Sequence, residues 1–214
     1  METDLLTVTE IFHSIQGETS LAGVRFAFIR LTGCNLRCSY CDTAYAFHEG
    51  KNMRIDEILS AIKPFEAKHI LVTGGEPLIQ QNTPILLKAL SCSKYIVSIE
   101  TNGELPINTV VNLARVIMDI KTPGSGMLRG GFRKNLPLLK HGDEIKFVIT
   151  SEDDYRWAKG LVLSGELPPI TTLFSPASNQ LQKWLAEKII EDRLPVRFQL
   201  QLHKVIWGLS TRGV

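Results

Sequence analysis

Residues 32–45 read TGCNLRCSYCDTAY and place three of the four cysteines of the chain, Cys34, Cys38 and Cys41, in a C-x3-C-x2-C pattern. A structural zinc site takes four closed ligands, usually in two C-x2-C knuckles. The fourth cysteine, Cys92, is remote and is expected to be a small buried apolar residue. His48 could be a fourth ligand, but its distance from Cys41 is not a standard zinc spacing. A [4Fe–4S] cluster normally takes four thiolates, so three cysteines would leave one iron open to a small molecule.

Apolar runs rich in β-branched residues surround this segment and predict buried strands. The runs are Phe26–Leu31, His69–Val72, Tyr95–Ile99, Val116–Ile120, Ile145–Ile149 and Thr171–Phe174. Helical patterns separate most of them, for example an apolar stripe at one face of residues 55–62. Thr83, Ser151 and Ser178 are predicted N-caps of three further helices. In particular, Ser151 and Asp154 resemble a capping box.

Alternating strands and helices with buried strands predict a parallel sheet covered by helices. About six strands are too few for a closed eight-fold barrel of ~250 residues, so we expect an open, partial parallel (β/α) barrel. The chain is expected to form one domain, with an N-terminal extension over residues 1–24 and a barrel core over 25–176. A C-terminal helix, strand and tail over 177–214 are expected to cover the barrel mouth.

Polar and glycine residues follow the predicted strands. The second strand ends in TGGEP (73–77), the third in ETNG (100–103), and the fourth, VIMDIKTPGSG, in Asp119, Lys121 and Ser125. Each group alone could be an ordinary turn. Because the carboxyl ends of parallel strands share one rim, however, their coincidence predicts a functional site there.

Composition excludes several classes of function. The 214 residues carry a net charge of +2 and only 7% aromatic residues, which argues against binding of nucleic acid or a polybasic membrane contact. The acidic N-terminus lacks the pattern of a signal peptide, and no apolar run approaches the ~18 residues that span a membrane. We therefore expect a cytoplasmic protein with reduced thiols.

The cysteine spacing after a first strand resembles the cluster loop of the radical S-adenosylmethionine superfamily. Tyr40, just before Cys41, and the GGEP run at residues 74–77 fit the same pattern. The resemblance implies that S-adenosylmethionine chelates the open iron of a [4Fe–4S] cluster through its amino and carboxylate groups. One-electron reduction would then cleave it to a 5′-deoxyadenosyl radical, which abstracts hydrogen from the substrate.

Motifs near the two ends of the chain resemble those of one family within this superfamily. FHSIQGE (12–18) and FQLQLHKVIWG (198–208), together with the cysteine loop, resemble the 7-carboxy-7-deazaguanine synthase family. This implies conversion of 6-carboxy-5,6,7,8-tetrahydropterin to 7-carboxy-7-deazaguanine with loss of ammonia, in queuosine or other 7-deazapurine biosynthesis. It also implies Mg2+, a homodimer, and an electron donor such as flavodoxin or ferredoxin.

The resemblance assigns candidate roles to residues of this chain. The cluster ligands would be Cys34, Cys38 and Cys41, with Thr43 on Mg2+. Cofactor contacts would come from Tyr40, Asp42, Gly74, Gly75, Glu76, Ser125 and Ser175. Pterin contacts would come from Ile15, Gln16, Gly17, Arg30, Thr73 and the carboxylate of Val214. Arg30 could bind the substrate carboxylate, or form a salt bridge at the rim. His203 and Lys204 could belong to the site, or only lock a last strand over the mouth.

Three alternatives remain at this stage. A glycyl-radical activating enzyme shares the cluster loop and the small size, but it acts on a protein. An iron–sulfur electron carrier usually has four cysteine ligands and does not need the GGEP run. A zinc-dependent RNA-binding module would show clustered basic and aromatic residues, which this chain lacks.

Overall fold

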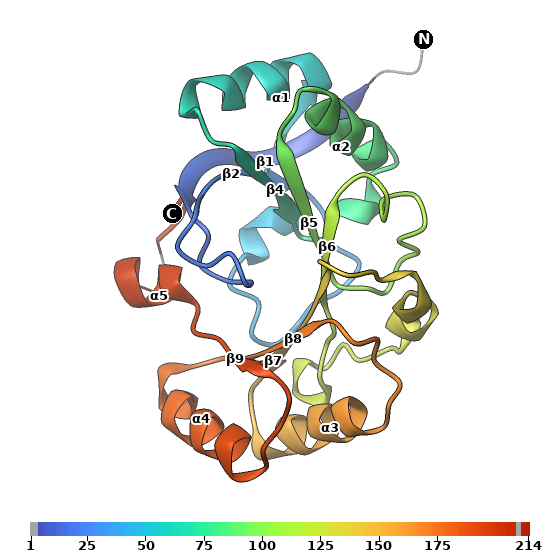
Figure 1. Cartoon of the computed structure of the whole chain (residues 1–214). Coiled ribbons are helices and arrows are strands. Elements are labelled where there is room, and N and C mark those ends of the chain that lie inside the picture. Colours follow the sequence, from blue (N-terminus) through green and yellow to red (C-terminus); the bar gives the residue numbers. More distant parts are fainter. Residues whose placement is uncertain (1–3, 209–210) are drawn as a thin grey trace.

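The computed structural model describes residues 4–208 and 211–214 and contains one curved, open sheet (Figure 1). Its nine strands lie in the order β3-β1-β2-β4-β5-β6-β7-β8-β9. The strands are β1 (Leu5–Ile15), β2 (Arg25–Leu31), β3 (Lys51–Arg54), β4 (His69–Gly74), β5 (Ile96–Thr101), β6 (Arg115–Asp119), β7 (Glu144–Ile149), β8 (Thr171–Pro176) and β9 (Arg197–Phe198). Residues 1–3 of the predicted N-terminal extension and 209–210 of the predicted tail lie outside the description.

The six predicted strands are β2 and β4–β8, which run parallel, so the open, mostly parallel sheet is confirmed. β9 continues the parallel run, whereas β1 pairs antiparallel with β2 and β3. All six residues of β7 are buried, as expected for a strand covered on both faces. The curved sheet therefore presents the carboxyl ends of its parallel strands at one rim.

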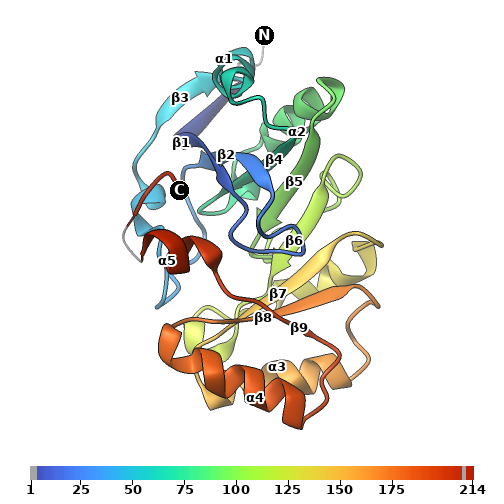
Figure 2. The ribbon, with the colours of Figure 1, turned by 60° about the vertical axis from the view of Figure 1, so that its left-hand side comes forward.

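Four helices cover the convex face of the sheet (Figure 1, Figure 2). They are α1 (Ile55–Ile62), α2 (Thr83–Cys92), α3 (Glu152–Leu163) and α4 (Gln182–Glu191). The fifth, α5 (Leu202–Trp207), lies on the open side of the sheet, between the β1–β2 pair and β9 in both views. Among the described residues, none of the helices combines the length and apolar character that crossing a bilayer requires.

Several local predictions need correction. Thr83 is the first residue of α2 and Asn82 is its N-cap; the Thr83 hydroxyl donates to the carbonyl of Pro77 instead of capping the helix. Ser178 precedes a short 3-10 turn and makes no capping bond through its side chain. Cys92 is exposed at the last position of α2, whereas Leu86, Leu87 and Leu90 of this helix are buried. In contrast, Ser151 caps α3 as predicted, accepting from the amide of Asp154 at 3.2 Å.

The C-terminal signature folds differently from the prediction. His203 and Lys204 lie in helix α5 and not in a strand, and β9 contains only two residues. The sequence allows for a last strand over the barrel mouth that His203 and Lys204 would lock in place. In the structure, the side chains of Val205 and Ile206 are instead more than half exposed on the outer side of α5.

The open side of the sheet is closed by the residues between β1 and β2, which meet the segment after β9. The backbone N–H of Thr19 donates to the side-chain oxygen of Gln199 at 2.7 Å, and the amide of Gln199 donates back to the Thr19 carbonyl at 2.7 Å. Leu202 N–H donates to the carbonyl of Gly17 at 2.9 Å. We call these contacts between residues 16–20 and 199–202 the seam. The seam joins parts of the chain that are far apart in sequence. It closes the open side of the curved sheet, which is a half-barrel.

Candidate active site

A cavity of about 410 Å3 opens inside the curve of the sheet, at the carboxyl ends of the parallel strands. It collects fourteen of the seventeen predicted site residues from β1, β2, the cysteine loop, β4 and the turn after it, the seam and the C-terminus. These are Ile15, Gln16, Gly17, Arg30, Cys34, Cys38, Tyr40, Cys41, Asp42, Thr43, Thr73, Gly74, Gly75 and Val214. Glu76, Ser125 and Ser175 do not line it.

The cysteine loop is held by its own backbone and by Arg37. The guanidinium of Arg37 donates to the carbonyls of Cys34 and Leu36 at 2.8 and 2.7 Å and lies 4.1 Å from the ring centre of Phe47. The amide of Leu36 donates to the sulfur of Cys34 at 3.4 Å, and Cys41 N–H donates to the Cys38 carbonyl at 3.2 Å. Amide donors to sulfur are a feature that tunes iron–sulfur centres.

The donor set fits a [4Fe–4S] cluster. Cys34, Cys38 and Cys41 are free thiols that share one cavity wall. Burial raises the pKa of the Cys34 and Cys38 thiols, so bound iron would be needed to keep them as thiolates at neutral pH. Within residues 4–208 and 211–214, no three His, Cys, Asp or Glu side chains converge on a single metal ion. Cluster thiolates bind different irons and need not converge in this way.

Two glycines bring the end of β4 against the cysteine loop. A Cβ on Gly74, whose φ is +153°, would lie 2.2 Å from the carbonyl oxygen of Leu31. A Cβ on Gly75 would lie 2.0 Å from the carbonyl oxygen of Gly33 and 2.7 Å from Cβ of Cys34. Only glycine permits this approach, so the GGEP turn and the cluster loop are placed as one unit.

Glu76 faces away from the cavity and organises the turn. Its buried carboxylate accepts from the Leu78 amide at 3.0 Å, the Thr101 hydroxyl at 2.9 Å and the Asn102 amide at 2.7 Å. Burial outweighs these bonds and raises the pKa of Glu76 to about 7. The structure therefore gives this side chain a role in holding the ends of β4 and β5 together.

The two predicted serines are also removed from the cavity. Ser125 is buried; its hydroxyl donates to the carbonyl of Thr122 at 2.6 Å and accepts from the Met127 amide at 3.0 Å, which closes a turn. Ser175 is fully buried in β8, and its hydroxyl has no hydrogen-bond partner among the described residues. The predicted cofactor contacts of these two side chains gain no support from the geometry.

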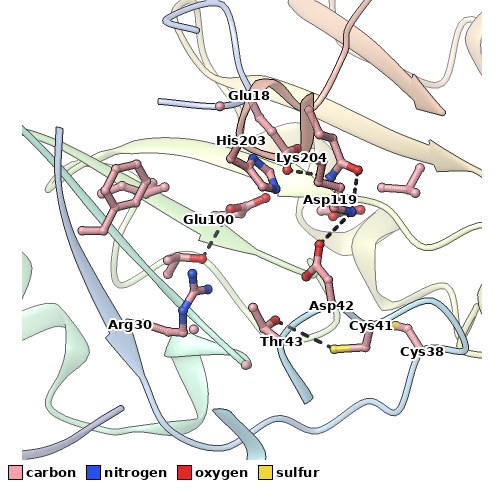
Figure 3. Close-up of a pocket in the computed structure, with 18 of the residues that line it drawn as sticks. Glu18, Arg30, Cys38, Cys41, Asp42, Thr43, Glu100, Asp119, His203 and Lys204 are labelled. Carbon is pink, nitrogen blue, oxygen red and sulfur yellow. Dashed lines mark hydrogen bonds and ion pairs between the residues drawn. The ribbon is translucent and has the colours of Figure 1, made fainter. Parts of the chain in front are cut away.

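A buried network of charges forms another wall of the cavity (Figure 3). The ammonium of Lys146 lies 2.7 Å from Glu18, 2.5 Å from Glu100 and 3.2 Å from Asp119. Lys121 pairs with Asp119 at 3.0 Å. Burial alone would lower the pKa of the Lys121 and Lys146 ammonium groups. Asp119 is the main group that raises the pKa of Lys121, and Asp119, Glu100 and Glu18 raise that of Lys146. Both lysines are therefore cationic across the neutral range.

Charges from the seam and α5 adjoin this wall. Burial alone would raise the pKa of Glu18, but Lys146 and then His203 lower it to about 2. Lys204 lies 2.8 Å from Asp42 and lowers the pKa of that carboxyl against the effect of burial. Burial lowers the pKa of His203, which favours its neutral form. Gly17 makes room for this histidine, because a Cβ there would lie 2.3 Å from its Nδ1 atom.

Arg30 reaches the cavity from β2, as Figure 3 shows. Its Nε atom pairs with Glu10 at 2.7 Å, and Tyr45 donates its hydroxyl to the same carboxylate oxygen at 2.8 Å. The Arg30 guanidinium carbon lies 5.7 Å from the ring centre of Phe12. The salt bridge considered from the sequence is therefore present. It engages Nε only, so it is compatible with an anion bound by the end of the guanidinium.

The C-terminal residues close the rim of the cavity above Tyr45. The guanidinium carbon of Arg212 lies 3.7 Å from the ring centre of Tyr45, and its Nη1 atom lies 2.8 Å from Glu49. Val214 lines the cavity two residues later. The terminal residues are thus attached to the loop that follows the cysteines.

Sequence reasoning gave no individual role to several cavity residues, among them Lys146 and Glu18, and it placed Glu100 at the rim without assigning it a ligand. A signal existed for Lys146, because it is the only charged residue in the apolar run Ile145–Ile149. For Glu18 the signal was its place in the SIQGE motif. Their partnership could not be read from spacing, because Glu18 and Lys146 are separated by 128 positions.

A half-barrel with three cysteines after its first parallel strand and a glycine turn after its second defines the radical S-adenosylmethionine class of enzymes. The family model for the radical SAM superfamily matches residues 28–123. The crystal structure of QueE from Escherichia coli has the same fold, with a TM-score of 0.74, 21% identity and coverage of 91% of this chain and 94% of that one.

Curated relatives identify the family within this class. The 7-carboxy-7-deazaguanine synthase of Chlorobaculum tepidum is 46% identical, covering 98% of this chain and 97% of its own. The enzyme of that name from Koribacter versatilis is 39% identical, covering 98% and 100%. The chain belongs to the 7-carboxy-7-deazaguanine synthase family of radical SAM enzymes. This membership disfavours the glycyl-radical activating enzyme, the electron carrier and the zinc module.

Proposed function

We propose that this chain converts 6-carboxy-5,6,7,8-tetrahydropterin to 7-carboxy-7-deazaguanine with loss of ammonia, as a lyase in queuosine or other 7-deazapurine biosynthesis. The observation that carries the proposal is the full-length similarity to synthases of that name. The cavity supports it, because the cysteine loop, both terminal segments and the polar wall meet there.

The chain's own residues bind and orient two small molecules. Cys34, Cys38 and Cys41 would hold a [4Fe–4S] cluster, which together with S-adenosylmethionine supplies the radical that removes the substrate C6 hydrogen. On the cofactor side, Tyr40, Asp42, Gly74 and Gly75 line the cavity beside these cysteines. The glycine turn places backbone, rather than side chains, against the space beside the loop.

On the substrate side, Arg30 offers a planar cation to the pterin carboxylate, with Glu10 and Tyr45 fixing the orientation of its guanidinium. Backbone and amide groups of residues 15–17, Thr73 and the Val214 carboxylate would contact the ring. Thr73 donates to Glu100 at 3.3 Å, which places both side chains at one edge of the cavity. A ring with alternating donors and acceptors suits such a polar edge.

We also propose that Thr43 binds Mg2+ together with the substrate carboxylate and water. Mg2+ prefers oxygen ligands and commonly keeps several waters, so a single protein hydroxyl is sufficient. Thr43 lines the cavity, and its described side-chain contact is a distant one, 3.9 Å from the sulfur of Cys41.

Further expectations follow from the family. We propose a cytoplasmic homodimer that is reduced by a flavodoxin or ferredoxin and acts as a single domain with residues 25–176 as its core. The exposed side chains of Val205 and Ile206 on α5 are an apolar surface that a second subunit could cover.

The test is an anaerobic assay of the reconstituted protein with S-adenosylmethionine, dithionite, Mg2+ and the pterin, followed by mass. We expect a product lighter than the substrate by one ammonia, formed with only catalytic S-adenosylmethionine and absent with the Cys38→Ala variant. Cleavage of S-adenosylmethionine with an unchanged pterin would refute the substrate assignment and keep the radical SAM class.

A further inference from the structure

The ammonium group of Lys146 is fully engaged inside the protein. Its side chain is 4% exposed, and Nζ lies within 3.2 Å of carboxylate oxygens of Glu18, Glu100 and Asp119. A lysine has three N–H donors, and each has a carboxylate here. With every donor directed at the protein and its pKa raised, Lys146 has neither a free N–H for a ligand nor a free amine for chemistry.

All three of its carboxylate partners line the cavity, and two of them, Glu18 and Glu100, are each held at both oxygens. Glu18 binds Lys146 through Oε2 and accepts from the amide of Gln201 through Oε1 at 2.8 Å. Glu100 binds Lys146 through Oε1 and accepts from the hydroxyl of Thr73 through Oε2 at 3.3 Å. An ionised carboxylate has about four lone-pair sites, so both retain acceptor capacity toward the cavity.

We propose, building on the function proposed above, that Lys146 is a positioning residue that fixes the carboxylates of Glu18 and Glu100 as acceptors for the N–H groups of the pterin edge. The two carboxylates come from the seam and from β5, so no local geometry holds them at a common spacing. A single ammonium between them supplies that spacing.

Charge balance explains why a cation is needed at this position. Three carboxylates, Glu18, Glu100 and Asp119, meet two ammonium groups, those of Lys146 and Lys121. Beyond them, α5 presents His203 and Lys204, and the cysteine loop presents Asp42, which pairs with Lys204. Without Lys146, three like charges would share one ammonium, and a buried carboxylate in that position takes up a proton more readily.

The experiment compares Lys146→Met, Lys146→Arg and the exposed control Lys183→Met in the reconstituted enzyme, with Tm measured for each. For Lys146→Met we expect the KM for the pterin to rise at least tenfold, with kcat and S-adenosylmethionine affinity changed less than threefold. Lys146→Arg should recover most of the loss because it keeps the charge. Lys183, on the outer side of α4 and 87% exposed, should have no effect.

The pH dependence of the KM for the pterin distinguishes a positioning role of Lys146 from general destabilisation of the fold. Glu18 is ionised in the wild type at neutral pH because Lys146 keeps its pKa near 2. In Lys146→Met that pKa rises, so the KM should be at least fivefold higher at pH 6 than at pH 8, whereas the wild-type KM should stay within twofold.

Three results would overturn the inference: an unchanged KM, an equal loss of pterin and S-adenosylmethionine affinity, or no recovery by arginine. If Lys146→Met does not fold, Glu100→Gln is measured in the wild-type and Lys146→Arg backgrounds. Non-additive effects of the two substitutions on KM would support the inference, because coupled residues behave in this way, and additive effects would overturn it. Absence of pterin turnover by the wild type would instead refute the proposed function.

Discussion

Gly75 is the point where the turn after β4 touches the cysteine loop, and an alanine there should damage both. The added Cβ would lie 2.0 Å from the carbonyl oxygen of Gly33 and 2.7 Å from Cβ of Cys34. Neither atom can swing away, because one is backbone and the other is the first atom of a side chain. Restoring a tolerable contact requires the turn and the loop to separate by about 1 Å.

The size of the effect follows from that displacement. Overpacking against backbone costs about 1–3 kcal/mol of the free energy of unfolding. For a chain of this size, each kcal/mol lowers Tm by about 2–4 °C. A displacement of about 1 Å near reacting groups reduces turnover by about 100-fold. We expect Gly75→Ala to show a lower urea midpoint, weaker S-adenosylmethionine binding and about 1% of wild-type turnover.

The matched control is Gly160→Ala in α3. Gly160 has no atom within 4 Å of an added Cβ, and alanine is the better helix former by about 0.5–1 kcal/mol. This variant should raise the urea midpoint and leave iron content unchanged. A Gly75→Ala protein with wild-type midpoint, iron content and S-adenosylmethionine affinity would show that the loop and turn are not packed as described.

Three further predictions test other parts of the molecule. Gln199→Ala leaves the buried N–H of Thr19 without a partner and its carbonyl with only the Ala22 amide at 3.2 Å, which should lower the free energy of unfolding by about 1–3 kcal/mol in urea titrations; an unchanged midpoint would contradict the seam. Glu76 has a folded pKa raised from 4.5 to about 7, so its contribution to stability should fall as pH rises from about 4.5 through 7. The stability advantage of the wild type over Glu76→Gln should therefore shrink across that range, and a constant difference would argue against the raised pKa. Residues added after Val214 should raise the KM for the pterin severalfold if its carboxylate contacts the ring, and an equal KM would remove Val214 from the site.

Local sequence patterns predict the sheet, but they do not predict the ion pairs around Lys146. The six parallel strands follow from apolar runs bounded by polar residues, and the cysteine loop follows from spacing alone. The ion pairs of Lys146 join the seam, β5 and β6 to β7, and no rule of spacing connects residues so distant in the chain. Glu76 shows a different limit of sequence reasoning, because its place in the GGEP motif does not reveal that its side chain is buried away from the cavity; its contact with the cofactor stays a prediction.

The C-terminal segment was the least predictable part. Its VIW run has β-branched and aromatic residues that favour a strand, but α5 forms with those side chains partly or largely exposed. The helix places His203 and Lys204 on its cavity side, where Lys204 can reach Asp42. Tertiary contacts, rather than intrinsic preference, decide the conformation of so short an element.

The seam also determines when the enzyme becomes complete during its synthesis. Thr19 and Gln199 are 180 positions apart, and closing so long a loop is entropically costly before other contacts reward it. The sheet from β2 to β8 can assemble before the seam, because the seam needs residues 199–202. A nascent chain therefore reaches a stage at which the cysteine loop has formed and the cavity remains open to solvent. The cavity can close only once Gln199 and the residues around it are free to pair with Thr19.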